Sequence, residues 1–304
     1  MYSIARVDPH LSEGLEQLGS KRKFWYLDGP RRMLFKFEER GTGEDWAEKI
    51  ACELARLLGL PHVDYELAVE IGDDKPGVVC ESCATGYTGI VLGNQLMLQG
   101  DASYPAGPGN RYNVRQHTVD AVAEVISTLH PVPAKWAVDL PVGVSSALDT
   151  FAGYVMLDAW IANQDRHDEN WGALRQGQEF FLAPSFDHGA SMARNISDSE
   201  REERLRSRDA GRRIPHFAAR ARSAFYSDPS APKPMTTLRA WHAFAAKAPS
   251  AAIAWRGRLA DANEAAVRQV VSEVPPNRIS EVGGEFTLQL LLENQRRILT
   301  GAGG

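Results

Sequence analysis

The sequence predicts an α+β fold with two lobes, a strand-rich N-terminal lobe and a helical C-terminal lobe. Between residues 24 and 81, four short apolar segments are separated by turn residues and by one amphipathic helix pattern. From residue 118 onward, apolar residues recur mostly at helical spacing. The length of 304 residues exceeds what one small core requires. We therefore expect an N-lobe over residues 1–98, a connecting loop over residues 99–117 and a C-lobe over residues 118–304.

Composition and charge describe an ordinary soluble globular protein, with 43% apolar and 24% charged residues. The net charge of −5 argues against direct nucleic-acid binding, because phosphate backbones attract a basic surface. Three cysteines cannot all pair in disulfides, so a reducing cytoplasm is the simplest location. The N-terminus has no long apolar run typical of a signal peptide. The longest apolar stretch, residues 151–162, is too short to cross a bilayer, so no membrane insertion is expected.

The N-lobe strands are predicted from short apolar runs and the turns between them. Residues 24–27 and 33–37 form a β-hairpin, because both are apolar and aromatic and Asp28-Gly29-Pro30 between them is typical of a turn. Residues 65–71 and 77–81 are predicted as two further strands, because a Gly- and Pro-containing turn separates them.

A helix is predicted from about Glu44 to Leu58. Large apolar residues form one stripe along it, and three alanines form a second face of small residues that permits close approach to a sheet. Gly59 marks the end of this helix, because glycine adopts the left-handed conformation that commonly follows the last helical turn.

The C-lobe elements follow a loop rich in glycine, proline and alanine at residues 99–110. Residues 195–222, dominated by charged residues, are predicted as either a mobile segment or a solvated helix. The other elements that we expect are a helix from Val119 with Thr118 as its N-cap, an apolar helix over residues 146–162, a hairpin over residues 174–182 and a helical remainder to Gln295.

Two acidic motifs follow the apolar helix. The first is Asp165-Arg166-His167-Asp168-Glu169-Asn170, and the second, about twenty residues later, is Phe186-Asp187-His188-Gly189. An Asp and an Asn five positions apart, followed by a second Asp, form the acidic half of a phosphoryl-transfer site. Asp165 is predicted to orient and deprotonate an attacking hydroxyl, and Asn170 and Asp187 to hold Mg²⁺ against nucleotide phosphates. Apolar neighbours on both motifs favour this interpretation over a merely polar loop.

The other half of such a site is predicted at Lys36, a single charge within the second strand of the hairpin. Its ammonium either reaches nucleotide phosphates or lies in water at a strand edge. A phosphate-binding lysine requires a carboxylate to fix its position. Glu48, beside the alanine face of the following helix, is the candidate that we favour; Glu53, near the larger apolar stripe, is its competitor, and Glu44 in the first turn is a weaker one.

A glycine-containing basic turn, Gly19-Ser20-Lys21-Arg22-Lys23, precedes the hairpin. Backbone N–H groups in such a turn, with cations nearby, form an anion site, and its position on the hairpin of Lys36 suits a phosphate-covering loop. Cys80 and Cys83 have the spacing of metal or redox ligands, but no second pair completes a site. We interpret them as small hydrophobic residues.

Taken together, Asp-Arg-His-x-x-Asn and Phe-Asp-x-Gly resemble two related families, the HipA-like bacterial serine/threonine kinases and the phosphatidylinositol kinases. The Gly19–Lys23 turn, the strand around Lys36 and the position of Glu48 look like the HipA pattern. The resemblance extends from about Gly19 to Gly189 and is strongest at the two acidic motifs. It implies a two-lobed protein-kinase-like fold.

The resemblance also implies roles for individual residues. Asp165 is the expected catalytic Asp, Asn170 and Asp187 the Mg²⁺ ligands, and Lys36 the nucleotide lysine. The segment 79–84, with Glu81, Ser82 and Cys83, is the expected hinge at adenine. Arg166 is expected to brace the loop, and His167 is kept as a catalytic candidate that either braces the loop or touches phosphate.

Two departures from the HipA pattern are noted. Full-length HipA proteins carry an additional N-terminal subdomain, which the short stretch before Gly19 is not expected to supply. In HipA proteins the autophosphorylated serine lies just before the loop glycine, where this chain has Glu16-Gln17-Leu18, so Ser20 is the nearest substitute.

The expected function is an ATP- and Mg²⁺-dependent kinase that phosphorylates a serine or threonine of a protein. Two alternatives stay open for Ser20: it is autophosphorylated, or it only caps the turn or donates a hydrogen bond to a phosphate. The alternatives are a lipid or small-molecule kinase of the phosphatidylinositol-kinase type and a nucleotide-binding module without catalysis. The family resemblance also implies an antitoxin or other regulatory protein as a partner.

Overall fold

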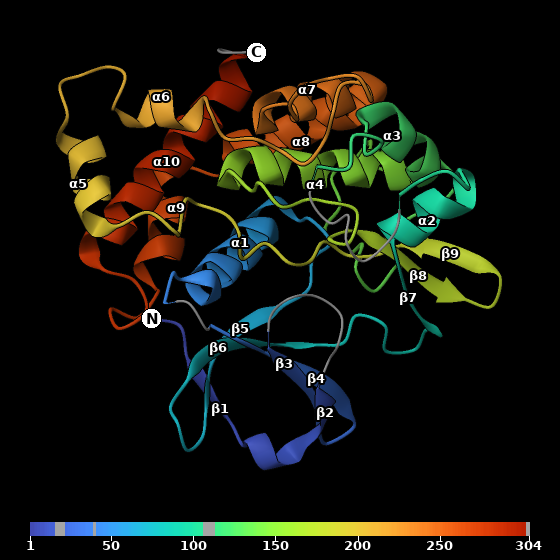
Figure 1. The fold of residues 1–304 in the computed structure, drawn as a ribbon, viewed down its shortest axis with the longest axis horizontal. Helices are drawn as coiled ribbons and strands as arrows, with labels where there is room; N and C mark the ends of the chain where they lie inside the picture. The colour runs from blue at the N-terminus through green and yellow to red at the C-terminus, as the bar shows by residue number, and fades with distance from the viewer. Residues whose placement is uncertain (16–21, 39–40, 106–112, 302–304) are drawn as a thin grey trace.

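The computed structural model describes residues 1–15, 22–38, 41–105 and 113–301, and it has two lobes (Figure 1). The lower lobe in Figure 1 is a six-stranded sheet with the order β1-β5-β6-β4-β3-β2. β1 pairs with β5 in parallel, and the remaining neighbours pair antiparallel. The strands are β1 (Ile4–Val7), β2 (Ser12–Leu15), β3 (Lys23–Asp28), β4 (Arg31–Phe37), β5 (Tyr65–Glu70) and β6 (Pro76–Glu81). The four strands predicted from sequence are β3 to β6; the short edge strands β1 and β2 were not predicted.

The two faces of this sheet differ because side chains alternate along each strand. Phe24 and Phe35 stack at 5.3 Å on one face, within an aromatic cluster that includes Phe37. Lys23 and Lys36 are direct partners in the β3–β4 register, so they share the opposite face. That face is directed toward the helix that follows the hairpin.

Helix α1 (Glu44–Leu58) lies between the sheet and the helical lobe (Figure 1). Its bounds agree with the predicted helix, because glycines with φ of +83° and +68° stand immediately before and after it, at Gly43 and Gly59. Cys52 on α1 packs against the sheet, whereas Ile50 and Leu54 belong to the large core of the helical lobe. α1 therefore packs against both lobes and joins them.

The helical lobe is built around α4 (Ala147–Ile161), which is buried over nearly its whole length. Ser146 caps it by accepting a hydrogen bond from the amide of Asp149. The helices around it are α3 (Val119–Ser127), α7 (Thr237–Lys247), α8 (Pro249–Asp261), α9 (Glu264–Ser272) and α10 (Glu281–Thr300). The predicted charged segment contains α5 (Asp198–Arg206) and α6 (Ile214–Ala218), both packed on α10, so the solvated-helix alternative describes α5.

A second sheet with the order β7-β8-β9 belongs to the helical lobe. β8 (Gly172–Gln176) and β9 (Glu179–Leu182) are the predicted hairpin, and β7 (Gly89–Leu92) pairs with β8. Residues 89–98, which the sequence assigns to the N-lobe, are thus hydrogen-bonded to the second lobe, and α2 (Gly93–Gly100) replaces the start of the expected loop. Four-residue strands and an eight-residue helix carry too little periodicity to be recognised from sequence.

Two arginines tie the lobes together. Arg278, before α10, donates to Asp45 of α1 and to the carbonyl of Ala68 in β5, both at 2.6 Å. Arg194 contacts Glu44 at the start of α1. Among the residues that the structure describes, no helix has both the length and the apolar character needed to span a bilayer.

Candidate active site

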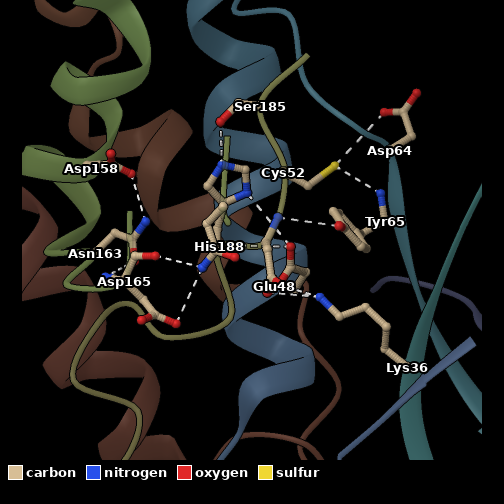
Figure 2. A network of polar contacts seen from close by, with 12 residues as sticks. Lys36, Glu48, Cys52, Asp64, Tyr65, Asp158, Asn163, Asp165, Ser185 and His188 are labelled. Atoms are coloured by element: carbon tan, nitrogen blue, oxygen red, sulfur yellow. Dashed lines mark hydrogen bonds and ion pairs between the residues drawn. The ribbon is translucent and has the colours of Figure 1, made fainter. Parts of the chain in front are cut away.

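The centre of the candidate site is Lys36, which extends from β4 toward α1 (Figure 2). Its Nζ lies 3.0 Å from Oδ1 of Asp187 and 3.7 Å from Oε2 of Glu48. Lys36 and Glu48 are buried, whereas about 30% of the Asp187 side chain is exposed. The fold therefore joins the hairpin, α1 and the second acidic motif at one point.

The electrostatics keep this cluster ionised. Burial lowers the pKa of Lys36, but Asp187 and Glu48 outweigh burial and hold it above the usual lysine range. Burial raises the pKa of Glu48, but Lys36 and His188 outweigh burial and hold it below the usual range. A charged ammonium therefore remains available at the position where a phosphate group requires one.

The alternatives for the lysine partner are resolved by geometry. The Glu53 carboxylate contacts Lys49 at 2.7 Å and Arg56 at 3.2 Å on the outer side of α1, away from Lys36. Glu44 contacts Arg194 at the first turn. The structure thus places Glu48, rather than Glu53 or Glu44, beside Lys36.

A chain of hydrogen bonds links Glu48 to the first acidic motif. The amide of His188 donates to Glu48 Oε1 at 2.9 Å, and His188 Nε2 lies 2.7 Å from Ser185 Oγ (Figure 2). Arg166 Nη2 donates to the same Ser185 oxygen at 3.0 Å. His188, Ser185 and Arg166 are each at most 2% exposed, so this chain is buried between the two halves of the site.

Arg166 braces the catalytic loop, as expected. It donates to both carboxylate oxygens of Asp158 on α4, at 2.7 and 2.8 Å, and to the carbonyl of Asn170 at 3.1 Å. Asn163 donates a further bond to Asp158 at 2.8 Å. Because Asp158 and Arg166 are both buried, this bidentate pair fixes where the loop leaves α4.

Asp165 and Asn170 lie side by side at the open end of this loop. Asn170 Nδ2 donates to the carbonyl of Asp165 at 2.6 Å. A carbonyl only accepts hydrogen bonds, so this contact fixes the amide and turns Asn170 Oδ1 the other way, as a metal ligand requires. The Asp165 carboxylate is partly exposed, about 26% of its side chain.

His167 faces Asp165 from within the same loop. Its Nδ1 accepts a hydrogen bond from the amide of Glu169 at 3.1 Å, so Nε2 carries the proton of the neutral ring. That Nε2 lies 3.6 Å from Asp165 Oδ1. His167 thus braces the loop through one nitrogen and presents the other to the candidate catalytic carboxylate.

The second acidic motif has an unusual backbone at Asp187, with a φ of +58°. Gly189 follows two residues later, and a Cβ at this position would lie 2.9 Å from Glu48 Oε2. The glycine is therefore required for the motif to approach α1 closely, and the Asp187 conformation directs the carboxylate to Lys36.

The expected adenine hinge forms the link between the lobes. Glu81 ends β6, and the amide of Ser82 donates to the carbonyl of Arg32 at 2.8 Å, so that amide is already engaged. Cys83 and Phe186 of the second acidic motif both pack against the apolar cluster that includes Cys80. Burial raises the pKa of Cys80 to about 12 and that of Cys83 to about 11, in keeping with packed thiols.

The predicted phosphate-covering turn is only partly described. Gly19, Ser20 and Lys21 lie outside the described residues. Lys23 begins β3, directly across from Lys36. The structure therefore brings one of the turn cations beside Lys36.

A pocket of about 170 Å³ adjoins Asp165 on the helical-lobe side. Its walls include Gln164, His167 and Asp168 of the loop that carries the first acidic motif. From segments that sequence reasoning did not assign to the site come Asn113, His117, Ser223 and Tyr226. The sequence also gave no role to Asp158, Ser185 and His188. For Asp158 a signal existed, because a lone carboxylate in an apolar helix requires a buried partner.

The comparisons with known proteins concern the fold. No protein-family model matches the chain, and no curated protein matches it. Among solved structures, the Helicobacter pylori proinflammatory kinase CtkA superposes with a TM-score of 0.67 at 18% identity, covering 98% of this chain and 97% of CtkA. The Shewanella oneidensis toxin–antitoxin complex of HipA, HipB and operator DNA has a chain that superposes with a TM-score of 0.55 at 14% identity, covering 93% of this chain and 64% of that one.

These similarities confirm the predicted two-lobed, kinase-like α+β fold and the predicted resemblance to HipA-like kinases at the level of the fold. The similarity to CtkA includes nearly the whole of both chains, whereas this chain spans about two thirds of the HipA-complex chain.

Proposed function

We propose that this protein is an ATP- and Mg²⁺-dependent kinase that transfers the γ-phosphoryl group to a serine or threonine hydroxyl of a protein. The observation that carries the proposal is the 3.0 Å contact between Lys36 Nζ and Asp187 Oδ1. It unites the lysine half and the acidic half, which lie 151 residues apart in sequence, into one phosphoryl-transfer site.

The donor groups suit the proposed cofactor. Mg²⁺ prefers oxygen ligands, and Asn170 Oδ1 and the partly exposed Asp187 carboxylate are proposed to supply them. When bound, Mg²⁺ neutralises charge that develops on the transferred phosphoryl group. The fit therefore rests on the chemistry of the donors and on the fixed orientation of the Asn170 amide.

The proposed roles are shared among several residues of the chain. Lys36, held by Glu48, positions the nucleotide phosphates, and Lys23 adds a second cation on the same sheet face. Asp165 aligns the acceptor hydroxyl and accepts its proton, while the Nε2–H of His167 stabilises the Asp165 carboxylate in position. The hinge at Glu81, Ser82 and Cys83 is proposed to contact adenine.

The acceptor hydroxyl is proposed to enter through the pocket beside Asp165. A pocket of about 170 Å³ holds one side chain rather than a whole ligand of ordinary size, which favours a serine or threonine presented by a protein. A lipid or small-molecule acceptor is the second candidate. A non-catalytic nucleotide-binding module is the third; the presence of Lys36, Asp165, Asn170 and Asp187 together argues against it.

Two regulatory elements belong to the proposal. Ser20 is proposed as an autophosphorylation site, where a phosphate would compete with ATP for the cations of the Gly19–Lys23 turn. A regulatory protein partner is proposed by analogy with the HipA complex, which contains HipB. The free cysteines suit a reducing cytoplasm as the location.

The decisive experiment incubates purified protein with labelled ATP and Mg²⁺, in parallel with a cell lysate and with lipid vesicles. We expect label in protein, with mass spectrometry locating autophosphorylation at Ser20. Label in lipid alone would replace the proposal by the second candidate, and nucleotide binding without any transfer would replace it by the third.

A matched thermal-shift measurement tests the metal ligands. ATP should raise the melting temperature more with Mg²⁺ than with EDTA, because a ligand of the folded state stabilises it by mass action. Asp187→Ala should abolish the Mg²⁺-dependent part, whereas Asp209→Ala, at an exposed turn, should leave it intact. An unchanged Mg²⁺-dependent shift in Asp187→Ala would remove Asp187 from the metal site.

A further inference from the structure

Three potential metal ligands converge behind the candidate active site. Cys52 lies on α1, and His62 and Asp64 lie in the segment that joins α1 to β5. One ligand atom from each lies within 4.8 Å of the other two. Asp64 Oδ1 is 3.3 Å from His62 Nε2 and 3.9 Å from Cys52 Sγ, and Figure 2 shows the contact between Asp64 and Cys52.

His62 is oriented as a metal ligand requires. Its Nδ1 lies 2.6 Å from the carbonyl oxygen of Leu60, which only accepts hydrogen bonds, so Nδ1 carries a proton. The other nitrogen, Nε2, points into the cluster. The His62 side chain is about nine-tenths buried, and Nε2 has no hydrogen-bond partner in the described part of the chain. A backbone carbonyl on one nitrogen and an unpaired second nitrogen are typical of metal-binding histidines.

We propose that Cys52, His62 and Asp64 form a Zn²⁺-binding site, separate from the Mg²⁺ ligands of the active site. One thiolate, one imidazole and one carboxylate are a donor set that suits zinc. Ligand atoms at about 2.0–2.3 Å from a tetrahedral ion lie roughly 3.3–3.8 Å from one another, close to the 3.3 and 3.9 Å that separate Asp64 Oδ1 from His62 Nε2 and Cys52 Sγ. Because Asp64 is exposed to solvent, a water molecule can occupy the fourth coordination position of the ion.

Two positive charges compete with a metal ion for this cluster. The guanidinium of Arg56 contacts Asp64 and lies 3.9 Å from Cys52 Sγ. A proton on His62 Nε2, which lies 3.3 Å from Asp64 Oδ1, is the second competitor. Zinc must displace the proton from Nε2 and the thiol proton from Cys52, and both are released to solvent.

The site would support the active site from behind. Cys52 is one helical turn beyond Glu48 on α1, and the amide of Tyr65 donates to Cys52 Sγ at 3.4 Å. The segment that carries His62 is hydrogen-bonded to Ser185 in both directions, through Val63 and Pro61. A bound ion would therefore fix the segment between α1 and β5, which holds Ser185 through these two backbone hydrogen bonds. Ser185 lies three residues before His188.

The test measures Zn²⁺ binding to the full chain directly, without nucleotide. Protein freed of metal is titrated with Zn²⁺, and Co²⁺ is used as a spectroscopic probe of a thiolate ligand. We expect one ion per chain and a rise in melting temperature. Cys52→Ser and Asp64→Asn should each weaken binding at least about tenfold, as expected for loss of a ligand. Asp64 is exposed, so its variant is expected to fold even if Cys52→Ser is not.

Arg56→Gln and two matched controls make the test discriminating. If Arg56 competes with the ion, Arg56→Gln should tighten Zn²⁺ binding several-fold. Cys83→Ser and Asp73→Asn, outside the cluster, should bind like the wild type. Three results would each overturn the proposal: wild-type affinity in Asp64→Asn and Cys52→Ser, no binding at micromolar Zn²⁺, or weaker binding by Arg56→Gln. The three side chains would then be interpreted as a cluster that shares protons and binds no metal.

Discussion

The two halves of the candidate active site are built in different ways. In the acidic half, Asp158, Asn163, Arg166 and Asn170 come from one continuous helix and loop, and the key partners Asp158 and Arg166 are eight residues apart. In the lysine half, Lys36 of β4 pairs with Glu48 of α1 and also reaches Asp187 of the acidic half, 151 residues away, so this contact forms only when both lobes are folded. Each half nevertheless contains a buried ion pair.

The halves also differ in how completely their charges are satisfied. Asp158 accepts two bonds from Arg166 and one from Asn163, and the pair is almost wholly buried. Lys36 is shared between Glu48 and an Asp187 carboxylate that remains partly exposed. The comparison teaches that the first pair is a fixed scaffold, whereas the second can exchange partners when ligands bind.

The largest effect is expected at the open end of the acidic half. Asp165→Asn keeps the shape of the side chain but removes the carboxylate that we propose accepts the hydroxyl proton. Turnover should fall by about 10²–10⁴-fold while ATP affinity changes little. Steady-state kinetics with a nucleotide-binding measurement check this. Turnover like that of the wild type would mean that Asp165 is not the catalytic base.

The buried pair of Asp158 and Arg166 should lose more stability than the Lys36 cluster when one partner is removed. Arg166→Met leaves Asp158 buried without its countercharge, and removal of one member of a buried pair typically costs about 3–5 kcal/mol of the free energy of unfolding. Denaturant unfolding measures this loss. The double variant Asp158→Leu/Arg166→Met removes both charges and should regain part of the stability. A double variant no more stable than Arg166→Met would contradict the view that the unpaired charge causes the loss.

A pH-dependent change in the free energy of unfolding is expected from His117, which lines the pocket beside Asp165. Burial lowers the pKa of His117 to about 4, and its Nε2 accepts a hydrogen bond from Trp171 at 3.1 Å. The unfolded chain binds this proton below about pH 6.5 and the folded chain only near pH 4, so stability is lost as pH falls between these values.

The loss should reach at most about 3 kcal/mol, because each pKa unit corresponds to about 1.4 kcal/mol. His117→Gln keeps an acceptor for Trp171 but does not titrate, so its melting temperature should vary less between pH 6.5 and 4 than that of the wild type. The exposed His216 provides the control, since His216→Gln should keep the wild-type slope. Equal slopes in all three proteins would show that His117 is not the titrating group.

The smallest effect is expected in the lysine half, where other contacts remain. Glu48→Gln keeps the hydrogen bonds near His188 but removes the charge that holds Lys36, so activity should fall roughly ten- to a hundredfold. Glu53→Gln removes a carboxylate from the same helix whose partners are Lys49 and Arg56, and should leave activity nearly unchanged. Kinetics on both folded variants decide; greater loss in Glu53→Gln would reverse the assignment of the lysine partner.

The sequence by itself determined the elements whose signals are local. Helix α1 was predicted with its observed bounds because its apolar stripe ends at Gly59, and α4 was predicted because its apolar run is long. The acidic half was recognisable for the same reason, since Asp165, Arg166 and Asn170 lie within six consecutive residues. One loop sets their spacing, so the spacing can be recognised directly in the sequence.

Only the tertiary structure decided contacts between distant segments. It placed Glu48 rather than Glu53 beside Lys36, because rotation of α1 between two apolar surfaces depends on the packing of both lobes. It also placed β7, Gly89–Leu92, in the second sheet through its pairing with β8. The convergence of Cys52, His62 and Asp64 arises likewise from how α1 meets the segment before β5. Such contacts depend on packing across the whole core, which residue spacing along the chain does not encode.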